Sequence, residues 1–313
     1  MILGGKGIMT LTELRYVVAV YKEQHFGRAA QSCMVSQPTL SIAVKKLEDE
    51  LGVIIFDRSS SEIIVTEAGE RIIEQAQIIL AESDKLKAIA VQQHDELDGA
   101  FKLGLIFTIA PYLLPKMIMP LHKKAPDMPL ILEENYTHVI SDMLKKGSLD
   151  AIVIAEPFRE TGIEVVPLYE EPFFVIVPKG HNFEQQESVS SKQVARERVL
   201  LLTQGNCMRD NILSNCKELA AAQTNLQGVA NTLQGSSINT IKHMVAGGLG
   251  ISIMPTSALN ENDRNLFSVV PFKNPVPTRR VALAYRRNFV RPRAIQAIKE
   301  AIVSSDLQGV KFL

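Results

Sequence analysis

The chain is 313 residues long, is 46% hydrophobic and carries 34 basic and 34 acidic side chains, so it has no formal net charge. This length suffices for two or more domains, and the balanced charge excludes binding to nucleic acid or membrane through bulk electrostatics alone. No apolar run approaches the roughly 18 residues of a membrane span, no signal peptide is visible, and there are only three cysteines. These features predict a protein of the reducing cytoplasm without membrane association.

The first regular pattern begins after Met9. Residues 1–8 are Gly-rich and patternless, so we expect a tail before the fold and treat Met9 as an alternative start. Apolar residues in 11–20 recur at helical spacing, with Thr10 or Thr12 as N-cap. The segment therefore predicts an amphipathic helix.

Two further helices are predicted directly downstream. Residues 27–33 form a short helix whose small side chains allow close helix crossing, and 34–36 form a turn. Ser36 caps a longer helix that has Pro38 in its first turn and runs to Leu51. The buried stripe of that helix is expected to contain Leu40, Val44, Leu47 and Leu51, opposite the polar Gln37, Thr39, Ser41 and Lys45.

A short helix, a tight turn and a helix with a polar N-terminal face are typical of a helix-turn-helix, whose second helix enters the major groove. Residues 53–56 and 63–65 predict a β-wing. From Met9 to Thr66 there are six basic and seven acidic residues, so DNA binding requires the basic groups to cluster toward phosphate. The periodicity alone leaves open a helical packing or dimerisation module.

One long helix is predicted from Thr66 to about Gln93. A stripe of this length needs a partner, and a second copy of the same helix is the simplest choice. The alternative is that the stripe packs on its own domain. Its members are Ile72, Ile73, Ala76, Ile79, Leu80, Ser83, Leu86 and Ile89.

Beyond Asp98-Gly99, predicted strands and helices alternate, which is typical of an α/β sheet that binds ligands at the carboxyl ends of parallel strands. The first unit has strands at 101–107, 130–134 and 151–155 and helices at 112–124 and 139–146. A second unit starts with a strand at 171–178 and has a helix ending at Val245 and a strand at 251–255. A strand at 279–285 and a helix at 292–303 complete the first unit.

The second unit contains the most informative cysteine. Residues 199–202 predict a buried strand, followed by a loop at Gly205 and an N-cap at Asn206, so Cys207 lies in the first turn of a helix. A helix N-terminus with Arg209 nearby is expected to lower the pKa of the thiol and favour the nucleophilic thiolate.

Cys216 lies nine residues after Cys207, on the opposite face of such a helix and about 13 Å along its axis. Because a disulfide needs Cα atoms within about 7 Å, the two thiols can pair only if the segment unwinds. The residues thus allow a redox switch, but they equally allow cysteines that pack as small buried hydrophobes. Cys33, in the second helix, is predicted to be a packing residue.

The N-terminal segment resembles LysR-type transcriptional regulators. The resemblance implies a winged helix-turn-helix that binds operator DNA, with base contacts from the start of the recognition helix and phosphate contacts near the wing. We expect these DNA contacts from Ser36, Gln37, Pro38, Thr39, Ser41, Lys45 and Arg58. The motifs that carry the resemblance are 26–30, 35–41, 42–48, 51–58 and 66–69.

The resemblance implies α/β architecture with an N-terminal winged helix-turn-helix, a long linker helix and a two-lobed regulatory domain like periplasmic binding proteins. The expected DNA-binding domain is 9–66, the linker helix 67–97 and the regulatory domain 98–313. Lobe I comprises about 98–169 plus 276–313, and lobe II about 170–275. Linker helices pair two subunits in this family, and we expect dimers to assemble into a tetramer.

The cysteine segment resembles the peroxide-sensing members of the family, through Gly205 to Asp210 with Cys216. The resemblance implies that Cys207 is the peroxide-reactive thiol and Cys216 the resolving thiol. It also implies that Thr108 and Thr137 are hydroxyls around the peroxide, with Asp210 completing the polar surroundings. Family members often have histidine where this chain has Asn206, whose amide can still hold water or peroxide, and the segment from 216 to 237 is longer than expected.

Three functions therefore stand at this point. The first is an activator that responds to hydrogen peroxide through a reversible Cys207–Cys216 disulfide, works with RNA polymerase, and is reduced by glutaredoxin- or thioredoxin-type thiols. The second is a LysR-type regulator of a small metabolite whose cysteines are structural, and the third is a thiol peroxidase or reductase. The fused DNA-binding module argues against an enzyme. The six histidines lack ligand spacing, so we expect no metal and no cofactor.

Overall fold

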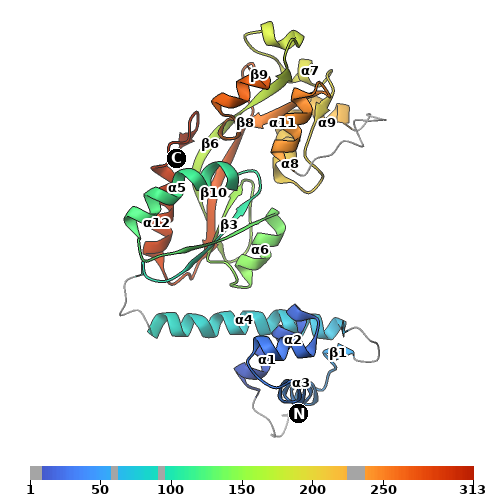
Figure 1. Ribbon diagram of the computed structural model, residues 1–313, viewed down its shortest axis with the longest axis vertical. Coiled ribbons are helices and arrows are strands. Elements are labelled where there is room, and N and C mark those ends of the chain that lie inside the picture. Colours follow the sequence, from blue (N-terminus) through green and yellow to red (C-terminus); the bar gives the residue numbers. More distant parts are fainter. Residues whose placement is uncertain (1–8, 58–62, 91–95, 224–236) are drawn as a thin grey trace. The chain divides into compact units, whose positions relative to one another are not determined.

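The structure is a computed structural model that describes residues 9–57, 63–90, 96–223 and 237–313 (Figure 1). The chain divides into two compact units, residues 1–93 with 145–148 and residues 94–144 with 149–313. The predicted tail at 1–8 lies outside the described residues. Within these ranges, no helix has both the length and the apolar character needed to cross a bilayer.

The first unit begins with two helices whose starts are set by side-chain caps. α1 (Leu11–Glu23) starts at a capping box, in which Thr10 accepts the Glu13 N–H and Glu13 accepts the Thr10 N–H. Thr10 rather than Thr12 is therefore the cap. α2 (Phe26–Ser32) follows after a short turn.

Helix α3 (Gln37–Leu51) starts where the sequence predicts. The Ser36 hydroxyl accepts the backbone N–H of Thr39, and Gly52 ends the helix in the left-handed region with φ 68°. Leu51 was predicted to be buried but is 40% exposed, because the α3 members of the core end one turn earlier. Those members are Leu40, Val44 and Leu47.

The predicted wing is present as a shorter ribbon. β1 (Phe56–Asp57) pairs antiparallel with β2 (Ile64–Val65). Residues 53–55 do not belong to the strand, although Ile55 is fully buried in the core of the unit. Arg58 lies outside the described residues.

Helix α4 (Glu67–Ala90) carries the predicted stripe, and its first half packs on its own unit. Ile73 and Ala76 are buried in the core with α1 and α3, and Ile72, Ile79 and Leu80 pack partly against it. Cys33 is also partly buried against this core, as predicted. Leu86 is 69% exposed and so is available to another partner, whereas the side chain of Ile89 lies outside those that the structure describes.

The second unit is built on a mixed nine-stranded sheet with the order β4-β3-β5-β10-β6-β8-β7, with β9 and β11 paired to β6. β3 is parallel to both β4 and β5, as the alternating sequence pattern predicts. The first core lies between these strands and three helices, namely α5 (Ala110–Lys124), α6 (Thr137–Lys145) and α12 (Pro292–Val303). Its strands are β3 (Phe101–Ile106), β4 (Leu130–Asn135) and β5 (Ala151–Ala155).

A separate core forms at the other end of the sheet. Its strands are β7 (Val199–Leu200), β8 (Ile251–Pro255) and β9 (Phe267–Pro271). Its helices are α7 (Ser191–Val194), α8 (Cys207–Asn215), α9 (Lys217–Gln223) and α11 (Ile238–Ala246). The remaining short elements are η1 (Asn182–Gln185), η2 (Thr256–Ala258), η3 (Glu261–Asn265) and β11 (Lys311–Phe312).

One long strand, β6, contributes residues to both cores. β6 (Ile163–Pro178) pairs with β10 (Thr278–Arg286) over its first half and with β8 and β9 over its second half (Figure 1). The sequence predicted only the second half of β6, from Glu171 onward. The first half was missed because its burial comes from lying beside β10, which is more than a hundred residues away in the chain.

Candidate functional site

The start of α3 presents polar side chains to solvent. Gln37, Pro38, Thr39 and Lys45 are exposed, while Ser41 is half-buried. The Ser36 hydroxyl is exposed, and it also shares a hydrogen bond of 2.7 Å with the Thr39 hydroxyl. These residues have the exposure that DNA contact requires.

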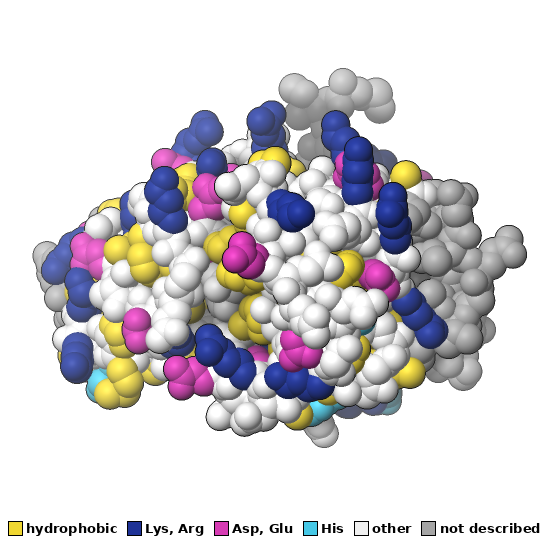
Figure 2. All heavy atoms as spheres, turned by 90° about the horizontal axis from the view of Figure 1, so that it is seen from above, with side chains coloured by type: hydrophobic (Ala, Val, Ile, Leu, Met, Phe, Trp, Pro, Cys, Tyr) yellow, Lys and Arg dark blue, Asp and Glu magenta, His cyan; other side chains and the backbone are white. Residues whose placement is uncertain are grey.

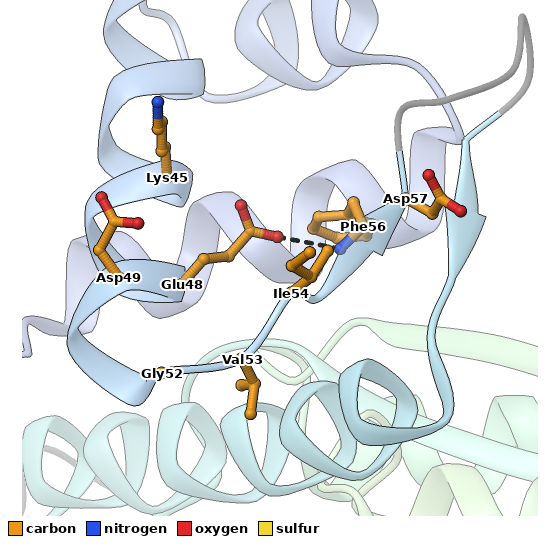
Figure 3. Close-up of a pocket in the computed structure, with 8 residues that line it drawn as sticks. All are labelled: Lys45, Glu48, Asp49, Gly52, Val53, Ile54, Phe56 and Asp57. Atoms are coloured by element: carbon orange, nitrogen blue, oxygen red, sulfur yellow. Dashed lines mark hydrogen bonds between the residues drawn. The ribbon is translucent and has the colours of Figure 1, made fainter.

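Some acidic residues of this unit already form contacts within it. Lys46 pairs with buried Glu13 at 2.8 Å. Burial raises the pKa of Glu13, but hydrogen bonds from Lys46 and Thr10 outweigh it and leave the pKa below its usual value. Glu48 points at the wing and accepts the N–H groups of Ile55 and Phe56 at 2.7 and 3.0 Å (Figure 3).

A surface groove of about 660 Å³ separates this part of α3 from β1, and Lys45, Asp49 and Asp57 line it (Figure 3). Acidic side chains therefore remain at the C-terminal half of α3, while its N-terminal half is free of them. Because Lys45 shares this groove with Asp49 and Asp57, any DNA contact must depend on local placement and not on net charge. Figure 2 shows a face of the second unit, where Lys and Arg also alternate with Asp and Glu rather than forming one field.

Cys207 is the first residue of α8, as the sequence predicts. Residues 199–202 are buried, Gly205 turns the chain with φ 88°, and the Asn206 side chain accepts the Met208 N–H at 3.0 Å. Asn206 is only 3% exposed, so its amide is held firmly against the start of the helix. The Asn206 cap therefore fixes the position of the Cys207 backbone at the start of α8.

The expected lowering of the thiol pKa is wrong. Burial raises the pKa of Cys207, and Asp210 adds to the rise, while the Thr137 hydroxyl and the Arg279 charge offset part of it. Arg209 does not act on the thiol, because its guanidinium donates to the Leu202 carbonyl at 3.2 Å. A helix N-terminus alone is too weak to overcome desolvation at this depth.

Arg279 rather than Arg209 acts on the Cys207 thiol, and this role was not predicted from the sequence. Its side chain is fully buried on β10, and its Nε donates to the Glu171 carboxylate at 2.8 Å. Its other two nitrogens donate to the Thr108 hydroxyl and carbonyl at 3.0 and 3.1 Å. Arg279 and Glu171 are the first residues of two predicted strands. A charged residue next to a buried apolar run was therefore the sequence signal that could have indicated this ion pair.

Three of the predicted pocket residues meet at Cys207. A small cavity of about 10 Å³ lies between them, close to the least volume that holds one water-sized molecule. The Thr108 hydroxyl already accepts from Arg279, so its own proton is free to be donated elsewhere. The cavity is lined by Thr108, Thr137, Asn206 and Cys207 together with Ile106, Phe107, Asn135 and Tyr136.

Asp210 does not join this small cavity. It lies instead on a second, larger pocket of about 470 Å³, here called the polar pocket, which also includes Thr137 and Cys207. The Thr137 hydroxyl lowers the thiol pKa, but it falls short of a formed hydrogen bond and has no partner among the described residues. Further polar residues of this pocket are His138, Ser141, Arg159, Glu160 and Asn211.

Cys216 lies in a different environment. It caps the far end of α8, is 1% exposed, and packs in the second core, whereas Cys207 packs against the first. The Ser191 hydroxyl donates to its sulfur at 3.7 Å. Both thiols are free, and a helix of nine residues spans about 13 Å, so a bond between them requires α8 to unwind.

A helix-turn-helix unit, a long helix and a two-lobed α/β unit together define the LysR class of bacterial regulators. The chain belongs to the LysR family. The family model "Bacterial regulatory helix-turn-helix protein, lysR family" matches residues 11–70, and the model "LysR substrate binding domain" matches residues 94–305.

Particular members of the family are similar along most of the chain. The "Hydrogen peroxide-inducible genes activator" of Pectobacterium carotovorum subsp. carotovorum is 37% identical over 279 residues, 89% of this chain and 90% of the relative. A full-length OxyR with a cysteine-to-aspartate change, from Pseudomonas aeruginosa, is 45% identical with a TM-score of 0.79, over 96% of this chain and 99% of that one. A reduced form of OxyR from N. meningitidis is 64% identical with a TM-score of 0.66, over 69% of this chain and all of that one.

Proposed function

We propose that the protein is a DNA-binding transcriptional regulator that senses hydrogen peroxide through a reversible Cys207–Cys216 disulfide and controls antioxidant genes. The observation that carries the proposal is the position of Cys207. It begins a helix beside a cavity of molecular size, with two threonine hydroxyls around it, while a second thiol ends the same helix. A relative named for induction by hydrogen peroxide supports the same function.

The chemistry uses groups of this chain. The Cys207 thiolate attacks one peroxide oxygen, the S–O bond forms as the O–O bond breaks, and the departing hydroxide takes a proton to leave as water. The sulfenic acid then condenses with the Cys216 thiol, forming the S–S bond and releasing a second water. Thr108 and Thr137 donate to the peroxide, and Arg279 stabilises negative charge on sulfur and oxygen.

Disulfide formation changes the structure because the helix between the thiols is intact when they are reduced. Unwinding α8 alters a segment that touches both cores, since Cys207 packs on one and Cys216 on the other. Oxidation can thus bias the arrangement of the two lobes. Exchange with a glutaredoxin- or thioredoxin-type dithiol in the cytoplasm would restore the reduced form.

DNA binding and assembly belong to the same proposal. Gln37, Pro38, Thr39 and Ser41 read bases, and Lys45 and Arg58 contact phosphate. The exposed Leu86 in the second half of α4 supports pairing of two linker helices. We expect these dimers to assemble into a tetramer that contacts RNA polymerase at the promoter.

A second candidate function has its own observation. A cleft of about 390 Å³, here called the aromatic cleft, is large enough for a small metabolite and is lined by Phe107, Thr108, Pro111, Tyr112, Tyr136 and Ile238 among others. A regulator of this kind would respond to a bound metabolite and keep its cysteines reduced. Enzymatic turnover is not part of either proposal, since the relatives are regulators.

Titration of thiols separates the two candidates. The reduced full-length chain has three cysteines, and one equivalent of hydrogen peroxide should remove two of the three thiols. A Cys33→Ser variant is the matched control, and it should lose the same two. Loss of no thiol, with unchanged operator footprint after peroxide, would favour the metabolite-responsive regulator.

A further inference from the structure

Three hollows meet around Cys207 and the start of α6. The small cavity shares Thr137 and Cys207 with the polar pocket, and it shares Phe107, Thr108 and Tyr136 with the aromatic cleft. The two larger hollows are therefore the routes that the described residues offer to a peroxide molecule entering the small cavity. The residues that border each of them indicate which.

The polar pocket contains buried polar atoms without partners. The Ser141 hydroxyl and the Asn211 amide oxygen have none among the described residues, although these side chains are only 3% and 6% exposed. The Thr137 hydroxyl is in the same situation. Leaving such groups unsatisfied costs about 1–3 kcal/mol each, so the pocket favours a small ligand that both donates and accepts hydrogen bonds.

The orientation of Asn211 is fixed by another contact. Its amide nitrogen donates to the Glu156 carbonyl at 3.0 Å, so its oxygen is available as an acceptor at the pocket wall. Thr137 and Ser141 lie one turn apart on α6 and both offer hydroxyl donors. Hydrogen peroxide has two O–H donors and oxygen lone pairs, and thus matches this set of groups.

The aromatic cleft is separated from the thiol. Cys207 is not among its lining residues, whereas it lines the polar pocket directly. The rings of Phe107 and Tyr136 meet edge to face at 5.3 Å and form a wall that the cleft and the small cavity share. Passage from that side would require the ring pair to separate.

We propose that the polar pocket is the port and holding site through which peroxide reaches Cys207, with Thr137, Ser141 and Asn211 as the holding groups. The proposal rests on the peroxide chemistry proposed for Cys207. Its volume of about 470 Å³ leaves room for the alkyl group of a small organic hydroperoxide, whose O–O bond would point into the small cavity. Attack by the thiolate then breaks the O–O bond, and the alkoxide takes a proton to leave as an alcohol.

Filling the port tests the proposal. The full-length chain and its Ser141→Leu variant are reacted with hydrogen peroxide or tert-butyl hydroperoxide, and oxidation of Cys207 is followed by quenched-flow mass spectrometry. Ser141→Leu should slow the reaction with hydrogen peroxide about tenfold, a rise of about 1.4 kcal/mol in the barrier, and should slow the bulkier peroxide more. Ser141→Ala, which removes the hydroxyl without filling space, should slow both peroxides equally and less.

The matched control fills the other hollow. Asn239→Leu adds bulk to the aromatic cleft at an exposed position and should leave both rates unchanged. If Asn239→Leu slows the reaction and Ser141→Leu does not, the port is the aromatic cleft and the inference is wrong. A wild-type Cys207 that fails to react with either peroxide refutes the proposed function itself.

A second variant covers the case in which the buried Ser141→Leu does not fold. His138 is exposed at the rim of the polar pocket, and its ring stacks on Tyr136 at 6.0 Å, which a tryptophan can reproduce. His138→Trp should slow tert-butyl hydroperoxide more than hydrogen peroxide, with an unchanged pH profile of thiol alkylation. Equal rates for wild type and His138→Trp, or a changed pH profile that explains the loss, would overturn the port.

Discussion

The buried ion pair between Glu171 and Arg279 gives the sharpest energetic prediction. The two residues face each other across β6 and β10, both side chains are fully buried, and their closest atoms are 2.8 Å apart. Breaking such a pair leaves an uncompensated buried charge, so Arg279→Met or Glu171→Gln should each cost about 3–5 kcal/mol. Replacing both partners removes that penalty.

The double variant Glu171→Met/Arg279→Met should not return fully to wild-type stability. Glu171 also accepts the Ser257 N–H at 3.1 Å, and Arg279 donates to two oxygens of Thr108. These groups lose their partners, at about 1–3 kcal/mol for each one left unsatisfied. The double variant should therefore be more stable than either single variant and less stable than the wild type.

The two single variants should differ in the pKa of the Cys207 thiol. Arg279 lowers the pKa of Cys207, so Arg279→Met should raise that pKa further. Glu171→Gln keeps the guanidinium charge and should not raise it. The two changes therefore destabilise the fold alike but differ at the thiol, which a purely structural role for the pair does not predict.

Two measurements on the full-length chain check this. Hydrogen–deuterium exchange at β6 and β10 gives the local free energy of opening, and alkylation of Cys207 by iodoacetamide against pH gives the thiol pKa. A loss below about 1 kcal/mol in both single variants would contradict the buried-charge argument. The same alkylation profile for Arg279→Met and wild type would show that the arginine does not act on the thiol.

Three further predictions concern pH, DNA and assembly. Because burial raises the folded-state pKa of Cys207, its contribution to stability is present below the unfolded pKa and lost as pH rises through the folded one. Peroxide oxidation, measured by mass spectrometry, should accelerate about tenfold per pH unit below that pKa, and a flat profile would contradict this. Lys45→Ala should weaken binding to operator and random DNA alike and reduce the salt slope by about one, whereas Thr39→Ala should mainly relax base preference. If both variants bind operator and random DNA as tightly as the wild type does, the placement of α3 is refuted. Leu86→Glu should dissociate the dimer, measured by sedimentation, without unfolding the monomer, whereas Ile79→Glu should destabilise the first unit as well. A wild-type chain that sediments as a monomer at micromolar concentration would refute the pairing of linker helices.

The parts of the fold that sequence predicted well have local causes. Thr10, Ser36 and Gly52 set helix ends through contacts within a few residues, and Asn206 does the same for α8. Periodicity therefore located the helix-turn-helix and the start of the cysteine helix. The prediction that Leu51 is buried was wrong, because an apolar stripe indicates which face of a helix is buried and not where the neighbouring core ends.

The site could be predicted only in part, because its electrostatics arise from tertiary packing. Arg279 and Glu171 are 108 residues apart and meet only because β6 and β10 are neighbours. The thiol pKa depends on burial against the first core, which no helix-terminus argument contains. Ser141 and Asn211 look like ordinary helical polar residues until their burial beside Cys207 is known.

Peptide mapping of the peroxide-treated full-length chain tests the central claim most directly. We expect a Cys207–Cys216 disulfide in the wild type, a trappable sulfenic acid at Cys207 in Cys216→Ser, and no rapid oxidation in Cys207→Ser. We also expect the amides of α8 to exchange faster in the oxidised form, because the bond requires the helix to unwind. Free thiols at both positions after peroxide, or modification confined to Cys33, would contradict it.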